Sequence, residues 1–208
     1  MGLPKLYPIL DAGLLAARGH DLRWAAERLK EAGAALLQYR DKAGSPQSVL
    51  QNADAIREAL AGADCRLILN DRPDLAVLAG WGGVHVGQGD LSPEDARRVV
   101  GASRCVGVST HNDGQVQLAN TSCADYIAVG PVFATGTKLD AEQVISLDGV
   151  RRARALTRKP IVAIGGITRG NARSVIEAGA DSVAVISALF VEGESVEKVA
   201  RDFLEILG

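Results

Sequence analysis

Residues 36–42 read LLQYRDK, a short apolar run that ends in polar side chains at every second position. In an extended segment, successive side chains point to opposite faces, so Gln38, Arg40 and Lys42 leave the strand on the same side. The stretch therefore predicts a buried strand whose end brings an amide and two cations to one place.

Similar apolar, β-rich runs recur along the chain and are separated by helical patterns. The strand-like runs lie at 5–10, 34–40, 66–70, 83–86, 104–109, 125–129, 160–164 and 181–186. The helical patterns lie at 22–32, 46–61, 73–79, 92–100, 112–120, 146–157, 170–178 and 195–207. Strands that alternate with helices predict βαβ units and a parallel sheet.

Eight such repeats within 208 residues favour an α/β fold of the (β/α)8 TIM-barrel type, with residues 1–208 as one catalytic domain. The alternative is a doubly wound sheet, which more often has five or six strands and a G-x-G-x-x-G turn after the first. Here the first strand runs into DAGLLAARG at 11–19, which does not match that turn.

The composition is that of a globular protein with one core, since 47% of the residues are hydrophobic and 23% are charged. The net charge of −2 and the absence of long charged runs argue against nucleic acid and anionic membranes as partners. Three cysteines without Cys-x-x-Cys spacing are expected to be reduced, and no apolar run has the length of a membrane helix. We therefore expect a cytoplasmic protein.

Polar residues follow seven of the eight expected strands, and in a barrel the carboxyl ends of the strands form one mouth. Arg40, Lys42 and Lys138 bring three positive charges to this mouth, a pattern suited to a phosphate or diphosphate. The alternative reading is that they are ordinary surface cations.

Asp71 and Asp90 follow adjacent strands, so their carboxylates are expected to face each other. Like charges placed in this way repel unless a cation lies between them, and Mg²⁺ prefers a few carboxylates together with substrate oxygens. In the alternative interpretation both residues only cap the helical segments that follow.

A second anion site is expected near the last strands. GGIT at 165–168 and Ser187 lie where many barrels bind phosphate on backbone N–H groups, and Thr135 and Thr137 add hydroxyl donors. Gly-Gly alone can also mark a tight turn. Two anionic substrates at one mouth imply a joining reaction with loss of diphosphate.

Together these stretches resemble the thiamine phosphate synthase (thiamine-phosphate pyrophosphorylase) family from the first strand to the last helix. The matching stretches are QYRDK at 38–42, LNDR at 69–72, GVHVGQGD at 83–90, STH at 109–111, GPVFATGTK at 130–138, AIGGI at 163–167 and GADSVAVIS at 179–187.

The resemblance implies a transferase that joins 4-amino-2-methyl-5-hydroxymethylpyrimidine diphosphate to a plain or carboxylated thiazole phosphate. Diphosphate leaves first, the thiazole nitrogen captures the resulting pyrimidine-methyl cation, and CO2 also leaves in the carboxylated case. The products are thiamine phosphate and diphosphate.

The resemblance also assigns roles to individual residues. The implied pyrimidine diphosphate ligands are Gln38, Tyr39, Arg40, Asp41, Lys42, Asn70, Ser109 and Lys138, of which Arg40, Ser109 and Lys138 are catalytic. The implied thiazole phosphate ligands are Thr135, Gly136, Thr137, Gly166, Ile186 and Ser187, and Asp71 and Asp90 bind Mg²⁺.

Two alternatives remain open at this point. A related thiazole tautomerase shares the barrel but tends to lose the metal carboxylates and to carry His where this chain has Pro131. A non-catalytic sensor of thiamine phosphates would keep the binding residues and lack turnover. His85 is expected to be a hydrogen-bonded barrel residue, and His111 is a candidate for supporting the site. The oligomeric state is left open, with a homo-oligomer as one outcome.

Overall fold

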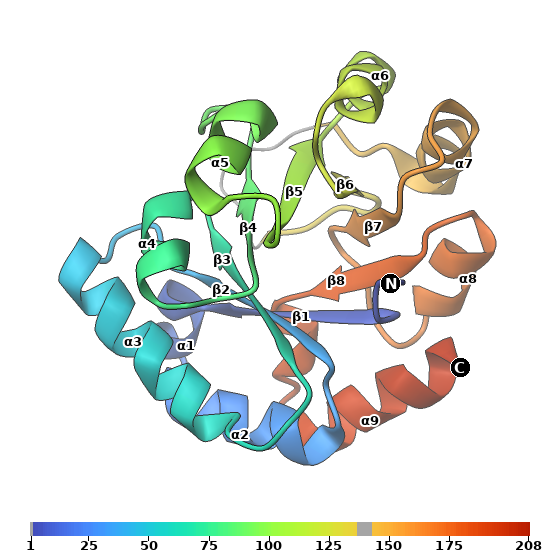
Figure 1. The fold of residues 1–208 in the computed structure, drawn as a ribbon. Helices are drawn as coiled ribbons and strands as arrows, with labels where there is room; N and C mark the ends of the chain where they lie inside the picture. Colours follow the sequence, from blue (N-terminus) through green and yellow to red (C-terminus); the bar gives the residue numbers. More distant parts are fainter. Residues whose placement is uncertain (1, 137–142) are drawn as a thin grey trace.

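Eight parallel strands form a closed barrel in the computed structural model, which describes residues 2–136 and 143–208 (Figure 1). The strands are β1 (Leu6–Asp11), β2 (Leu36–Arg40), β3 (Arg66–Asn70), β4 (Gly83–Val86), β5 (Cys105–Thr110), β6 (Tyr126–Val129), β7 (Ile161–Ile164) and β8 (Ser182–Val185). Each strand pairs with the next in sequence, and β1 pairs with β8 through Tyr7 and Ala184. This is the single-domain TIM barrel that the sequence predicted.

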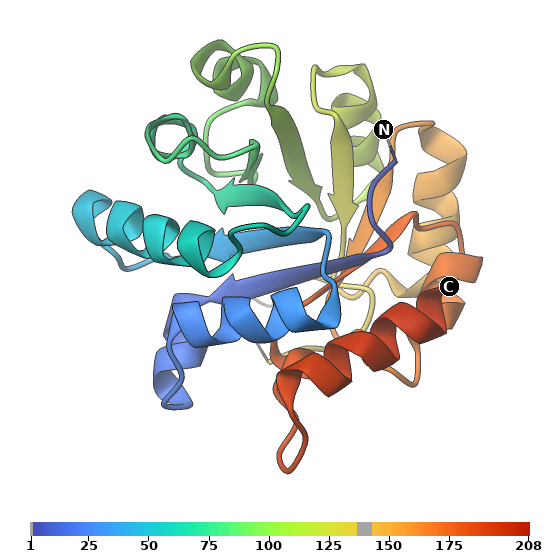
Figure 2. The same cartoon turned by 60° about the horizontal axis from the view of Figure 1, so that its bottom comes forward.

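Helices form an outer ring around the barrel, as Figures 1 and 2 show from two directions. They are α1 (Ala12–Ala17), α2 (Leu22–Ala32), α3 (Pro46–Ala59), α4 (Pro73–Leu78), α5 (Pro93–Val100), α6 (Asp113–Thr121), α7 (Ser146–Leu156), α8 (Ala172–Glu177) and α9 (Val196–Leu207), with the 3-10 helix η1 (Ser187–Leu189) after β8. Several begin at a side-chain cap: Ser45, Ser92 and Asn112 each accept a hydrogen bond from a backbone N–H three residues later.

The alternation of side chains along the strands divides the apolar core into two parts. One part lies between the sheet and the helices and includes Leu10, Leu37 and Phe203. The other fills the barrel interior and includes Tyr7, Ile9 and Tyr126. Because every second residue of a strand points inward, the last inward residues of the strands stand together at the mouth.

Two short elements were not expected from the sequence. Helix α1 follows β1 directly and is capped by Asp11, whose carboxylate accepts a hydrogen bond from the Leu14 N–H. The segment Ser187–Leu189 forms a single 3-10 turn. Both lie at the carboxyl ends of their strands and therefore border the mouth.

Within the described part of the chain, no helix is both long enough and apolar enough to cross a membrane. Cys65, Cys105 and Cys123 are all free thiols, as expected.

Candidate active site

A narrow cavity of about 40 Å³ opens at the centre of the mouth and is lined by Gln38, Asn70, His85 and Ser109. These four residues come from the neighbouring strands β2 to β5, and each lies within two residues of the carboxyl end of its strand. The Ser109 carbonyl also accepts a hydrogen bond of 2.6 Å from the Gln88 amide. The structure thus brings together the three neutral polar residues, Gln38, Asn70 and Ser109, that the sequence assigned to the pyrimidine diphosphate.

Arg40 stands beside this cavity and forms an ion pair with Asp11 at the end of β1. Asp11 is almost fully buried, and its other oxygen accepts from the Leu14 N–H of α1. Arg40 is therefore held toward the barrel by a carboxylate whose role the sequence did not reveal, because 29 residues separate the two.

Lys42, Asp71 and Asp90 form a charged cluster on the rim. Lys42 makes an ion pair with Asp71, and the Gly87 N–H donates to Asp90 over 2.8 Å. Burial and the neighbouring Asp90 raise the pKa of Asp71, while Lys42 opposes this shift. Burial also acts to raise the pKa of Asp90, but hydrogen bonds with Asp71 and Gly87 outweigh it and leave that pKa lowered. The two carboxylates are thus close enough to compete for one proton.

The backbone of Asp71 is in the left-handed region, with φ of 63°. This conformation is uncommon outside glycine, although aspartate tolerates it better than most residues. The Asp71 N–H donates to the His85 carbonyl over 2.7 Å, which fixes the turn that points this carboxylate toward Asp90.

The arrangement of the two carboxylates fits Mg²⁺. Among residues 2–136 and 143–208, no group of three or more potential metal ligands is found. A divalent cation would relieve the repulsion between two facing carboxylates, and Mg²⁺ commonly takes one or two carboxylates together with substrate phosphate oxygens.

Tyr39 and Asp41 are not brought to the mouth, although both were assigned to substrate. Tyr39 is fully buried between the sheet and the helices. Its hydroxyl donates to Asp41 and accepts from Asn52, and each hydrogen bond is 3.0 Å long. Asp41 accepts in addition from the N–H groups of Ala43 and Gly44. Because side chains alternate along β2, these two residues hold the loop after the strand and leave the mouth to Gln38 and Arg40.

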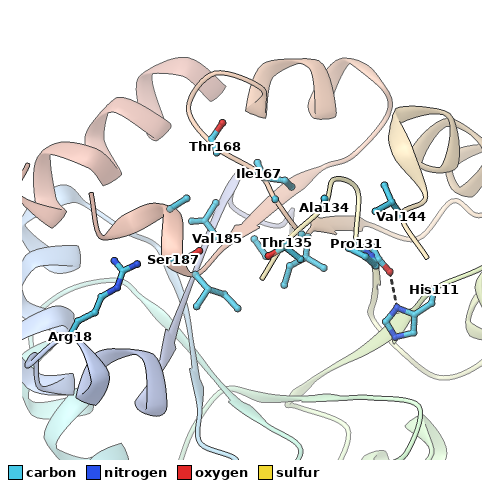
Figure 3. Close-up of a pocket in the computed structure, with 17 residues that line it drawn as sticks. Arg18, His111, Pro131, Ala134, Thr135, Val144, Ile167, Thr168, Val185 and Ser187 are labelled. Atoms are coloured by element: carbon cyan, nitrogen blue, oxygen red, sulfur yellow. Dashed lines mark hydrogen bonds between the residues drawn. The ribbon is translucent and has the colours of Figure 1, made fainter. Parts of the chain in front are cut away.

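A larger pocket of about 420 Å³ lies beside β6, β7 and β8 (Figure 3). Four of the residues assigned to the thiazole phosphate, Thr135, Gly166, Ile186 and Ser187, line it. Gly166 has φ of 64°, and a Cβ there would lie 2.6 Å from the Ala134 carbonyl oxygen, so only glycine allows this close approach. The apolar walls suit a flat ring, and the polar end suits an anion.

Arg18 is a residue of this pocket that the sequence did not reveal. It follows α1, and Figure 3 places its guanidinium on the side of the pocket where Ser187 lies. One of its nitrogens donates to the Phe190 carbonyl, and the guanidinium lies 5.7 Å from the centre of the Phe190 ring. Arg18 thus provides a full positive charge at the polar end of the pocket.

His111 stands on the opposite side of the same pocket (Figure 3). Its Nδ1 is 2.7 Å from the Gly130 carbonyl oxygen, and the His111 backbone N–H donates to the Gln115 side-chain oxygen. The ring is therefore held in a fixed orientation where it can support a ligand.

His85 is confirmed as a hydrogen-bonded barrel residue. Its Nδ1 is 2.9 Å from the Tyr126 hydroxyl, and its Nε2 is 2.8 Å from Ser109 Oγ. Two of the predicted ligands, Thr137 and Lys138, lie outside the described residues, and Gly136 lies on the exposed edge just before them.

A family model described as thiamine monophosphate synthase matches residues 6–189. The chain belongs to this family. Its match with the thiamine monophosphate synthase family includes all eight strands and every site residue named above.

Similar proteins agree with this assignment. The thiamine-phosphate synthase of Koribacter versatilis is 51% identical over 207 residues, which cover 99% of this chain and 96% of that protein. That of Chloroflexus aurantiacus is 44% identical, with 95% and 89% of the two chains covered. The solved thiamine phosphate pyrophosphorylase of Pyrococcus furiosus is 30% identical, with a TM-score of 0.87 and coverage of 98% and 95%. The synthase family and transferase activity expected from the sequence are confirmed.

Proposed function

We propose that the mouth binds 4-amino-2-methyl-5-hydroxymethylpyrimidine diphosphate and a thiazole phosphate side by side and joins them to form thiamine phosphate. The observation that carries this proposal is the division of the mouth into two compartments of different character. One contains cations and paired carboxylates, and the other has apolar walls with a polar, positively charged end.

The pyrimidine diphosphate takes the first compartment. Gln38, Asn70 and Ser109 line the central cavity and contact the pyrimidine, while Arg40 and Lys42 bind the diphosphate oxygens. Both cations are already paired with carboxylates, so the diphosphate competes with Asp11 for Arg40 and with Asp71 for Lys42. Lys138 is proposed as a further contact from outside the described residues.

Mg²⁺ is held by Asp71 and Asp90 in this proposal. When bound, the ion neutralises negative charge on the diphosphate and helps it leave. Lys42, which pairs with Asp71 in the structure, then becomes available to the diphosphate.

The thiazole phosphate takes the second compartment. Its ring lies against Ile186 and neighbouring apolar residues, and its phosphate is bound by Ser187, the Gly166 backbone and Arg18. Thr135 and Gly136 extend this contact toward the rim, and Thr137 is proposed to continue it. In this proposal, the nitrogen of the bound thiazole faces the central cavity.

In the reaction, the bond between the pyrimidine methylene carbon and the diphosphate oxygen breaks, and its electron pair leaves with the diphosphate. The thiazole nitrogen then donates its lone pair to the methylene carbon. The residues of the mouth position both partners and exclude water, which would otherwise capture the cation. With a carboxylated thiazole, the carboxylate leaves as CO2, and the electron pair left on the ring carbon takes up a proton.

Turnover of the purified protein tests this proposal. Both substrates and Mg²⁺ are expected to yield thiamine phosphate and one equivalent of diphosphate, with loss of product on chelation and recovery on adding Mg²⁺ again. Binding of both substrates without product would favour the sensor. Proton exchange on the thiazole without joining would favour the tautomerase. The cytoplasmic location and a homo-oligomeric state stay predictions.

A further inference from the structure

Five polar side chains inside the barrel form one continuous chain of hydrogen bonds. Gln38 Nε2 donates to the Tyr7 hydroxyl over 3.0 Å, and the hydroxyls of Tyr7 and Tyr126 share a bond of 2.9 Å. The Tyr126 hydroxyl is also hydrogen-bonded to His85 Nδ1 at 2.9 Å, and His85 Nε2 is hydrogen-bonded to Ser109 Oγ at 2.8 Å. The chain begins and ends at two residues of the proposed pyrimidine site and passes beneath that site.

The two tyrosines in the middle of this hydrogen-bond chain are buried away from solvent. Tyr7 and Tyr126 are each only 1% exposed. Burial raises the pKa of both hydroxyls far above the ordinary value, so both are neutral phenols. Each neutral phenol has a single proton to donate.

Gly107 makes room for the chain. A Cβ at this position would lie 2.0 Å from the Tyr126 ring, so any side chain at position 107 would displace that ring. The Tyr126 ring instead lies nearly parallel to the His85 ring, with centres 5.5 Å apart. The barrel is thus built to hold the Tyr126 hydroxyl between Tyr7 and His85.

The Tyr7 oxygen accepts from the Gln38 amide, whereas the distances alone fit either direction for the remaining bonds. If each tyrosine hydroxyl accepts one hydrogen bond and donates one, the Tyr7 proton is directed to the Tyr126 oxygen. Tyr126 then donates to His85 Nδ1, which makes His85 the tautomer with its proton on Nε2. That proton is donated to Ser109 Oγ, so the Ser109 hydroxyl proton points away from the chain toward the mouth.

We infer that Tyr7, Tyr126 and His85 are positioning residues that jointly fix the hydrogen-bonding roles of Gln38 and Ser109 toward the substrate. In this direction, Gln38 presents its carbonyl oxygen as an acceptor and Ser109 presents its hydroxyl as a donor. Reversal of the chain would exchange both roles together. This inference rests on the proposed function of the mouth as a pyrimidine diphosphate site.

The coupling suits an aminopyrimidine, whose amino group donates and whose ring nitrogens accept. A substrate of this kind needs an acceptor and a donor at defined places, and a mismatch leaves buried polar groups unpaired. Two independent rotating groups would satisfy this need only part of the time. A coupled pair satisfies it in every molecule.

The first test is the tautomer of His85, read by nitrogen NMR on histidine-labelled protein. Variants His20→Gln and His111→Gln assign the signals, because the chain has three histidines. We expect neutral His85 with its proton on Nε2 in the unaltered protein. We expect a mixture of tautomers in Tyr7→Phe, although Tyr7 lies two hydrogen bonds away from His85. A proton on Nδ1 in the unaltered protein, or no change in Tyr7→Phe, would overturn the inference.

The second test is kinetic. Tyr7→Phe and Tyr126→Phe should each lower kcat/KM for the pyrimidine diphosphate about 10- to 100-fold, the range expected for unpaired buried groups, and leave KM for the thiazole phosphate unchanged. The double variant should lose no more than the stronger single variant, because either change breaks the same chain. Losses that multiply, or an equal effect on both substrates, would contradict the inference.

Thr157→Val provides the matched control. It removes another buried hydroxyl, which donates to Asn120 over 2.6 Å at the opposite end of the barrel. The control should lose stability but keep both kinetic constants and the His85 tautomer. Because the tautomer is read without turnover, an inactive protein with the expected tautomer would refute the proposed function alone. An active protein with an uncoupled tautomer would refute this inference alone.

Discussion

The charged residues of the mouth are arranged so that the two proposed substrates depend on different cations. Arg40 stands at the central cavity and is held by Asp11, whereas Arg18 stands at the polar end of the larger pocket and is held by the Phe190 carbonyl. Arg40 ends β2 whereas Arg18 follows α1, and the two guanidinium groups lie at different compartments. Single substitutions can therefore separate the two binding events.

Arg40→Ala should raise KM for the pyrimidine diphosphate, and Arg18→Ala should raise KM for the thiazole phosphate. A charge-assisted hydrogen bond is worth about 1.5 to 3 kcal/mol, which corresponds to roughly a 10- to 100-fold effect. Steady-state kinetics with each substrate varied in turn measures both constants. Arg23→Ala is the control, because Arg23 pairs with the exposed Glu27 and Glu58. Equal effects of one variant on both substrates would contradict the two-compartment arrangement.

Asp71→Ala should abolish the dependence of turnover on Mg²⁺ and lower kcat/KM at least about 100-fold, since it removes one of two proposed metal ligands. Activity measured across a Mg²⁺ titration tests this, and circular dichroism checks the fold. Asp74→Ala is a matched control, because Asp74 lies three residues away and pairs with Arg72. Full activity of Asp71→Ala would remove the metal assignment.

The sequence predicted the position of a site residue where that position depends on neighbouring residues in the chain. Period-two alternation predicted that Gln38, Arg40 and Lys42 share a side, and the structure places the first two at the mouth and Lys42 on its rim. The same alternation explains why Tyr39 faces the helices, where it donates to Asp41, and the substrate contacts assigned to these two residues stay predictions. The partners of Arg40 and His85 could not be predicted, because they come from strands far away in the sequence.

Among the elements, the strands were the most predictable, and helix α1 and the 3-10 turn after β8 were the least. Each strand is an apolar run bounded by turn residues, and all eight form where expected. Helix α1 follows β1 without an intervening turn, so the sequence does not separate it from the strand, and Asp11 serves both as the last residue of β1 and as the cap of α1. The 3-10 turn Ser187–Leu189 is short, so its formation is decided by the surrounding packing.

The loop after β7 is fixed to the C-terminal helix by a charged network. Arg169 pairs with Glu194 and Asp202, and Lys198 pairs with the same two carboxylates. Arg169 and Lys198 together lower the pKa of Glu194 to about 2. Because this folded-state pKa is below the ordinary value of 4.5, Glu194 contributes stability above pH 4.5 that is lost as the pH falls toward 2.

Arg169→Ala should therefore lower Tm at pH 7 by a few degrees and make the further loss of stability on acidification shallower than in the unaltered protein. Thermal unfolding followed by circular dichroism from pH 7 to pH 3 measures the difference. Arg23→Ala again serves as the comparison, since its exposed pairs bridge no such loop. Parallel curves for Arg169→Ala and the unaltered protein would show that the network does not stabilise the fold.

For the whole molecule, closure of the barrel depends on the seam between β1 and β8. Helix α9 covers this region and buries Phe203 completely in the outer core, where α9 also packs against α2 and β1. The helix contributes no residue to the mouth. It therefore acts on function only by keeping the strands together.

Phe203→Ala should lower the free energy of unfolding by about 3 to 5 kcal/mol, the usual cost of removing a buried aromatic ring. Urea unfolding gives this value, and kcat at low temperature should stay near that of the unaltered protein while the barrel remains folded. Leu118→Ala, which shortens a side chain that is 73% exposed, should change stability little. A loss below about 1 kcal/mol for Phe203→Ala would indicate that the seam tolerates a cavity.

The contact between Lys5 and the last residues of the chain has a practical consequence. Lys5 Nζ donates to the carbonyl oxygens of Leu207 and Gly208 at the end of the barrel where β1 begins, and each hydrogen bond is 2.9 Å long. The mouth lies at the other end. A short peptide linker could thus join residue 208 to the start of the chain, and new ends could be opened in an exposed loop on the same side. Such a circular permutant, or a molecule immobilised through either terminus, would present an unobstructed mouth to solution.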